Sequence, residues 1–107
     1  MSDLTQKRCV PCEGGVPPLE KSEVEKLLAQ VAGWSLGEKW ITKEFQFKNF
    51  VQAMEFVKRV AELAESEGHH PDIHIHYNRV GFDIWTHAID GLTENDFILA
   101  AKINALK

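Results

Sequence analysis

The feature that most constrains this fold is a change of periodicity at residues 68–71. Before it, apolar side chains recur every three or four residues, which predicts a helix over residues 49–67. They are Phe50, Ala53, Met54, Val57, Val60, Ala61 and Ala64. After it, apolar and polar residues alternate strictly over residues 73–78, as in a β-strand. Because Gly68 favours a helix end and Pro71 prevents resumption, a short connection must join the long helix to the strand.

Residues on the N-terminal side of this junction predict a shorter helix and a hairpin. Ser22, with Glu25 three residues later, has the pattern of a capping box, and Gly33 marks the end of the helix. Residues 34–47 are rich in aromatic and β-branched side chains on both sides of turn residues at 37–38. This pattern predicts two antiparallel strands.

Residues on the C-terminal side predict a return strand and a last helix. A turn near Asn78 would reverse the chain, and the alternation that follows places His87 at the end of the return strand. Thr93, with Asp96 three residues later, is a plausible cap for a helix that carries apolar residues as far as Leu106.

The order helix, two strands, helix, two strands, helix predicts an α+β fold. We expect a four-stranded antiparallel sheet with the three helices packed on one face. A chain of 107 residues has the size of one domain with a single hydrophobic core. The domain is expected over residues 20–107. A flexible N-terminal arm over residues 1–19 precedes it, because Pro17 and Pro18 discourage an earlier helix start.

Charge and hydropathy exclude several classes of function. The formal net charge is −4, and acidic and basic residues are mixed along the chain, so we expect no direct binding of nucleic acid. No run of about 18 apolar residues is present to cross a bilayer, and the first residues lack the apolar core of a secretory signal. We therefore expect a cytoplasmic protein without a membrane partner.

The two cysteines, Cys9 and Cys12, have a spacing that is found in metal and redox sites. A structural zinc site commonly takes its ligands from two such pairs, and the sequence has no second pair. A redox pair needs its first cysteine at a helix N-terminus, whereas Pro11 and the glycines at 14–15 favour a loop. We interpret the pair as reduced thiols in the loosely ordered arm.

The five histidines divide into two groups. His74 and His76 form a pair on one face of the predicted strand, but no acidic ligand follows them closely, so we interpret both as exposed polar positions and expect no metal. His69, His70 and His87 lie on a loop and a strand end that would meet at one edge of the sheet. Because imidazole titrates near neutral pH, three of them around a cavity suit a reaction that removes one proton and delivers another.

The residues from about Leu19 to Lys107 resemble the pterin-4a-carbinolamine dehydratases. The motif of that family has a charged residue, three further residues, His-His-Pro, an aromatic residue, a later histidine and a final aspartate. It is matched by Glu65, His69, His70, Pro71, Tyr77, His87 and Asp96. The stretch GLTENDF, residues 91–97, is also similar to the signature that precedes the family's last helix.

The resemblance implies a dehydratase that needs no cofactor. Its substrate would be the 4a-hydroxytetrahydropterin left by aromatic amino acid hydroxylases, and its products quinonoid dihydropterin and water. His69 and His87 would transfer protons, one as general acid and one as general base, and His70 would hold the pterin. Asp96 would hold His87 in position. Glu65 would lie one turn below the histidine loop, either orienting the substrate or as a solvated carboxylate at a helix end.

The resemblance also implies a homodimer or homotetramer. The resemblance also implies that the reaction serves tetrahydrobiopterin recycling, and two alternatives to this role stay open. One is a pterin-binding module, or a dimerisation cofactor for a transcription factor, a role that some members of the family have. The other is a pterin reaction in folate or molybdopterin metabolism.

Overall fold

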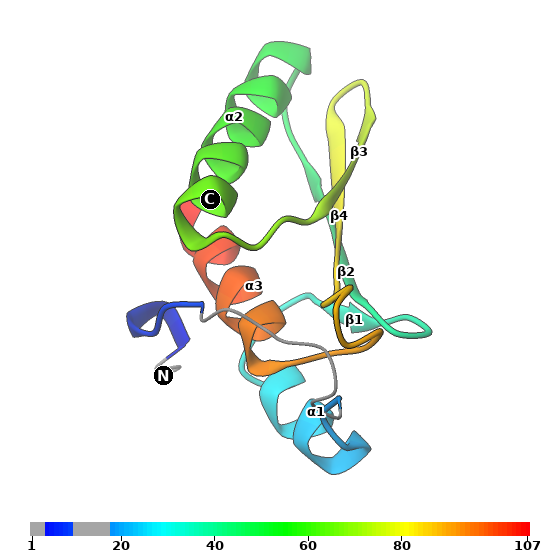
Figure 1. Ribbon diagram of the computed structural model, residues 1–107. Helices are drawn as coiled ribbons and strands as arrows, with labels where there is room; N and C mark the ends of the chain where they lie inside the picture. Colours follow the sequence, from blue (N-terminus) through cyan, green and yellow to red (C-terminus); the bar gives the residue numbers. More distant parts are fainter. Residues whose placement is uncertain (1–3, 10–17) are drawn as a thin grey trace.

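The chain forms a layer of helices against one antiparallel sheet in this computed structural model, which describes residues 4–9 and 18–107 (Figure 1). The elements are the short 3₁₀-helix η1 (Leu4–Gln6), the helices α1 (Lys21–Leu28), α2 (Phe50–Glu67) and α3 (Glu94–Leu106), and the strands β1 (Ser35–Leu36), β2 (Ile41–Gln46), β3 (Asp72–His76) and β4 (Arg79–Ile84). The strand order is β1-β2-β4-β3, and every neighbouring pair is antiparallel. The predicted α+β fold and its order of elements are confirmed.

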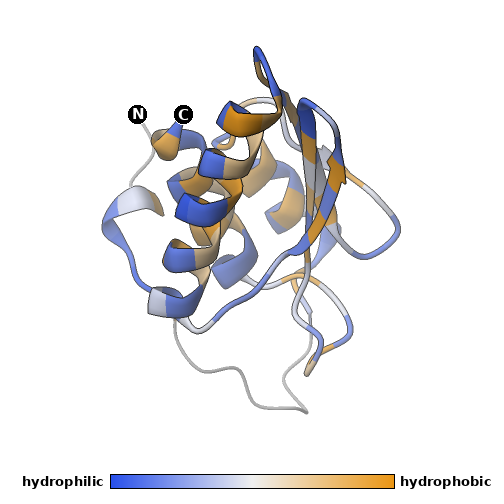
Figure 2. Cartoon of the chain, turned by 90° about the horizontal axis from the view of Figure 1, so that it is seen from above, coloured by the Kyte–Doolittle hydropathy of each residue, from blue (hydrophilic) through white to orange (hydrophobic). Residues whose placement is uncertain are grey.

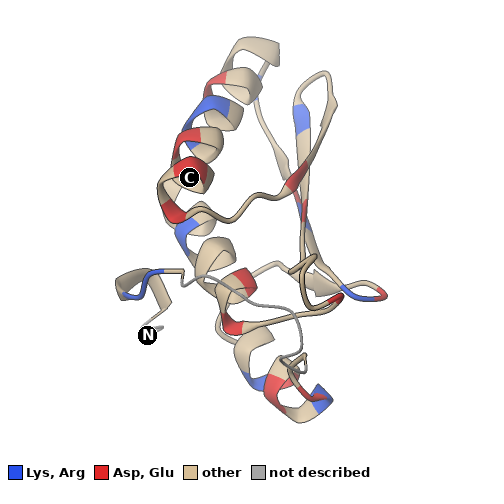
Figure 3. Ribbon diagram, viewed as in Figure 1, with Lys and Arg blue, Asp and Glu red and all other residues tan. Residues whose placement is uncertain are grey.

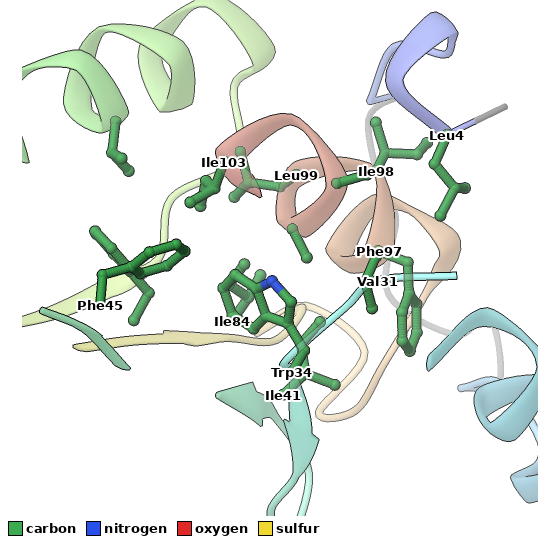
Figure 4. Close-up of a cluster of buried hydrophobic side chains, with 14 of the residues drawn as sticks. Leu4, Val31, Trp34, Ile41, Phe45, Ile84, Phe97, Ile98, Leu99 and Ile103 are labelled. Atoms are coloured by element: carbon green, nitrogen blue, oxygen red, sulfur yellow. The ribbon is translucent and has the colours of Figure 1, made fainter. Parts of the chain in front are cut away.

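The hydrophobic core lies between the helices and one face of the sheet. Along β4, Val80, Phe82 and Ile84 are fully buried, whereas the residues between them face the other way, as strand alternation requires. Phe97 and Ile103 of α3 are buried on the opposite side of this core (Figure 4). Figure 2 shows the two layers from above, with the second face of the sheet left without a covering helix among the described residues.

The long helix α2 begins and ends close to the predicted bounds, and it buries only part of the predicted apolar stripe. The Asn49 side chain accepts a hydrogen bond from the Gln52 N–H at 2.9 Å, and Gly68 ends the helix with a left-handed φ of 65°. The buried residues are Ala53, Phe56, Val60 and Ala64. Phe56 therefore belongs to the core, whereas Phe50 and Met54, which the predicted stripe included, are exposed.

Three local predictions were wrong. Ser22 does not cap α1, because the helix already begins at Lys21, with Glu20 at the N-cap position and no side-chain cap. Gly33 does not mark the end of this helix, because α1 ends at Leu28, with Ala29 at the C-cap position. His87 does not end a strand, because β4 stops at Ile84. Beyond it, Thr86 pairs with Gly91 in an isolated bridge, and the chain between them turns back on itself. His87 therefore lies in a turn, where its side chain is exposed.

The described part of the N-terminal arm is packed against the domain. Leu4 belongs to the hydrophobic core and η1 contacts α3. The boundary between residues 19 and 20 and the motion of the arm stay predictions, and the prediction for Cys12 lies outside the described residues.

Acidic and basic residues are intermixed over the helices (Figure 3). No helix in the ranges 4–9 and 18–107 has the length and apolar character needed to cross a membrane.

Candidate active site

A cavity of about 660 Å³ lies between the end of α2 and the turn after β4. Its walls are residues 65–70, residues 85–88, Cys9 and Asn95. His69, His70 and His87 all line it, so the structure brings together the three histidines that the sequence grouped. The left-handed turn at Gly68 directs the chain away from α2, and the turn that follows Thr86 carries His87 to the opposite wall.

His69 is the most constrained of the three histidines. Its Nε2 lies 2.5 Å from Oδ1 of Asp96, and the Asp96 side chain is fully buried. The other carboxylate oxygen, Oδ2, accepts hydrogen bonds from the Thr86 hydroxyl at 3.0 Å and from the Thr93 backbone N–H at 2.8 Å. Since a carboxylate accepts hydrogen bonds from all these donors, the shared proton belongs on His69 Nε2, which leaves Nδ1 as the basic nitrogen of the neutral ring.

Asp96 therefore holds His69 and not His87, which corrects the expected pairing. Asp96 lies in the first turn of α3, where its contact with the Thr93 N–H turns the carboxylate back below the histidine loop. His87 lies beyond Thr86 in the turn, and its ring packs instead against Trp85, with ring centroids 4.0 Å apart. The His87 ring is thus placed by an aromatic contact at the exposed side of the cavity.

His70 and Glu65 meet at the rim of the cavity. His70 Nε2 lies 3.3 Å from Oε2 of Glu65, and the two side chains are 60% and 79% exposed. Such an open contact contributes little to folding, because water competes for both groups. It leaves His70 free to exchange its contact with Glu65 for one with a bound molecule. The structure thus places Glu65 beside His70 at the rim as an exposed carboxylate, and an orienting role for it stays a prediction.

The remaining two histidines lie on the outer face of the sheet, as their interpretation as exposed positions requires. β3 is the edge strand and is exposed along its whole length. His74 Nε2 lies 2.7 Å from Oδ2 of Asp83 on the neighbouring strand β4. Within residues 4–9 and 18–107, no three His, Cys, Asp or Glu side chains gather in a way that could hold a metal ion.

Two further residues of the walls, Glu67 and Cys9, were not predicted to lie at this site. Glu67, the last residue of α2, accepts hydrogen bonds from Lys102 Nζ at 2.7 Å and from the Cys9 N–H at 2.8 Å. Burial acts to raise the pKa of Glu67, but these two bonds outweigh it and lower that pKa below its usual value. Burial and the Glu67 carboxylate together raise the pKa of the Cys9 thiol to about 12. Because the partners of Glu67 are 35 and 58 residues away, no local pattern reveals them.

Trp85 was also missed, although its signal is local. It follows directly after β4, is half-buried, lines the cavity and packs against the His87 ring. A large aromatic residue on the polar face of a strand, two positions before a histidine, is the pattern that points to it.

Residues 17–106 match the model of a protein family described as pterin 4 alpha carbinolamine dehydratase. A Rickettsia canadensis protein assigned by its name to the pterin-4-alpha-carbinolamine dehydratases is 51% identical, and the match covers 98% of each chain. A Rubrobacter xylanophilus protein of the same name is 50% identical, over 99% of this chain and 100% of its own. The crystal structure of a Brucella melitensis protein called transcriptional coactivator/pterin dehydratase superposes with a TM-score of 0.80 at 37% identity, covering 83% of this chain and 97% of that chain. Since these matches span nearly the whole chain, it belongs to the pterin-4a-carbinolamine dehydratase family.

Proposed function

We propose that this protein dehydrates 4a-hydroxytetrahydropterins to quinonoid dihydropterins by general acid and base catalysis from histidine. The observation that carries the proposal is the convergence of three histidines, from two separate segments, on one cavity. A buried carboxylate fixes the orientation of one of them. Membership of the dehydratase family supports the reaction class. The cavity, at about 660 Å³, is also in the usual size range for small-molecule sites.

The reaction needs one proton acceptor and one proton donor. The base removes the proton from N5 of the pterin, and the electron pair left on N5 forms the double bond to C4a. The bond between C4a and the hydroxyl oxygen breaks, and the leaving hydroxyl takes a proton from the acid to become water. No atom changes its oxidation state through an external agent, so two imidazoles suffice and no cofactor is required.

The geometry supports a division of roles between the histidines. His69 serves as the base, because its Nε2–H is engaged by Asp96 and its Nδ1 is left to accept a proton. His87 serves as the acid from the opposite wall, and His70 donates a hydrogen bond that holds the pterin ring. The roles of His69 and His87 exchange for a substrate of the opposite configuration at C4a.

A direct assay of dehydration tests this function. With enzymatically generated 4a-hydroxytetrahydropterin, we expect saturable acceleration of dehydration that is unchanged after treatment with a chelator. Activity that the chelator abolishes would instead indicate a metal-dependent mechanism. No acceleration, together with retained binding of a pterin, would leave a binding module as the function.

The binding module is the second candidate, since the similar Brucella protein is called a transcriptional coactivator as well as a pterin dehydratase. For the enzyme, we propose a place in tetrahydrobiopterin recycling, because aromatic amino acid hydroxylases generate its substrate. A role in folate or molybdopterin metabolism is the alternative pathway. Loss of growth on phenylalanine in a deletion strain that also contains the hydroxylase would support recycling.

The edge of the sheet supports the further proposal of a homodimer or homotetramer. β3 carries the exposed apolar residues Ile73 and Ile75 along an edge strand, and the exposed Phe50 and Tyr77 stack with ring centroids 6.5 Å apart nearby. Exposed edge strands with apolar side chains commonly pair with another strand. We expect sedimentation at neutral pH to give two or four times the chain mass of 12.1 kDa. A single 12.1 kDa species at micromolar concentration would contradict this proposal.

A further inference from the structure

Residues 4–9, which we call the docked segment, are held against α3 beside the cavity. Leu4 is only 2% exposed and lies next to Ile98 of α3 (Figure 4). At the other end of η1, Lys7 Nζ lies 2.8 Å from Oε2 of Glu94 in the first turn of α3. The basic residues of this segment thus lie beside a helix that begins with acidic residues (Figure 3). The buried Leu4 side chain anchors this segment, and the half-exposed Lys7–Glu94 pair contributes less to holding it.

The docked segment reaches the cavity at Cys9. The Cys9 backbone N–H donates to Oε1 of Glu67 at 2.8 Å, and the Cys9 thiol donates to the Asn95 carbonyl at 3.6 Å. Cys9, Glu67 and Asn95 all line the cavity that holds the three histidines. Cys9 is therefore fixed by two contacts to neighbouring residues of the same wall.

Glu67 joins the docked segment to the two helices that carry the catalytic groups. Its second oxygen, Oε2, accepts from Lys102 Nζ of α3 at 2.7 Å, and its side chain is only 6% exposed. Glu67 precedes His69 by two residues, and Asp96 lies on the same helix as Lys102. A buried carboxylate with both oxygens engaged has little freedom to move, so one residue ties together α2, α3 and the docked segment.

We propose that the docked segment is a wall of the pterin site, and that Glu67 positions it so that its docking sets the affinity for the pterin ring. This inference rests on the proposed function. A flat heteroaromatic ring binds more tightly when a further wall shields it from water. Cys9 suits such a wall, because a thiol with a raised pKa stays protonated at neutral pH and presents an uncharged surface.

The contact between Cys9 and Glu67 is tested by a matched pair of variants. Cys9→Pro removes the backbone N–H that Glu67 accepts, whereas Cys9→Ala keeps that donor and removes only the thiol. A hydrogen bond to a charged group corresponds to a factor of about ten or more in an equilibrium constant. We expect KM to be about tenfold higher in Cys9→Pro than in Cys9→Ala. The two kcat values should agree within about threefold, because neither change touches the His69–Asp96 pair.

A second variant keeps Cys9 and measures docking itself. In a Cys12→Ser background, Cys9 is the only thiol that iodoacetamide can alkylate. Only the thiolate reacts, and burial keeps Cys9 protonated, so the alkylation rate rises when the docked segment leaves its place. Leu4→Ala removes the apolar contact of the docked segment, far from the histidines, and should raise the alkylation rate at least tenfold. In Leu4→Ala, the affinity for a stable pterin should weaken, and KM for the substrate should rise by about the same factor. Quenching of tryptophan fluorescence measures the pterin affinity.

The outcomes separate this inference from the proposed function. Faster alkylation in Leu4→Ala with unchanged pterin affinity would show that the docked segment is not a wall of the pterin site, even if the protein is an active dehydratase. Equal KM values in Cys9→Pro and Cys9→Ala would also overturn it. Failure of the unaltered protein to dehydrate its substrate would refute the proposed function, and the pterin affinities would still decide whether the docked segment is a wall.

Discussion

His87→Ala is expected to lower kcat by about 10²–10⁴-fold, the usual contribution of one general acid or base. The cause is chemical, because the exposed His87 ring contributes little to the core and the fold does not depend on it. Its principal described contact is with the ring of Trp85, which stays in place at the cavity wall. KM should change by less than about fivefold, since His70 and the remaining walls still hold the ring. Steady-state kinetics with generated 4a-hydroxytetrahydropterin measure both values.

The matched control for His87→Ala is His76→Ala. His76 is also an exposed histidine, but it lies on the outer face of the edge strand, away from the cavity. Its removal should leave kcat unchanged. A similar fall of kcat in both variants would show that the effect of His87→Ala is not specific to the cavity. A fall of less than threefold in His87→Ala would remove His87 from the mechanism.

The fold was predictable because its elements carry strong local signals. The periodicity over residues 49–67 and the alternation over 73–78 gave the correct types and order of α2 and β3. The caps at Asn49 and Gly68, and the Thr93–Asp96 pair at α3, are local interactions that a single sequence displays. The exposure of Phe50 and Met54 was not predictable in this way, because the rotation of α2 about its axis depends on the helix and strand it packs against.

The candidate site was predictable in membership but not in its contacts. The motif grouped His69, His70, His87 and Asp96, and the structure places the three histidines around one cavity, with Asp96 behind His69. Which histidine Asp96 holds depends on where β4 ends, and β4 ends at Ile84, three residues before the predicted end at His87. Cys9 and Glu67 were beyond sequence reasoning, because their contact joins residues 58 positions apart.

Asp96→Asn is expected to lower kcat by at least about 100-fold while the protein stays folded. The Thr93 N–H donates to one side-chain oxygen of Asp96, and asparagine can keep this contact only by turning its carbonyl oxygen toward Thr93. Its amide NH₂ then faces His69, where it donates to Nε2. The proton of the neutral ring consequently moves to Nδ1, and the basic nitrogen no longer faces the substrate. Thr93 remains the N-cap, and the carbonyl oxygen of an asparagine at position 96 still accepts from its backbone N–H, so α3 begins at the same place.

Three measurements distinguish this positioning role from loss of structure. In ¹⁵N-labelled protein, the ring nitrogen shifts of His69 should change from those of the Nε2-protonated tautomer to those of the Nδ1-protonated tautomer. A structural defect does not produce this change. Asp83→Asn is the matched control, because Asp83 forms the same kind of pair with His74 on the outer face of the sheet, and its kcat should not change. Asp96→Ala should instead unfold more easily, by about 1–3 kcal/mol, since the buried Thr86 hydroxyl and the Thr93 N–H lose their shared acceptor. An Asp96→Asn protein that keeps full activity with unchanged ring shifts would show that His69 does not depend on this carboxylate.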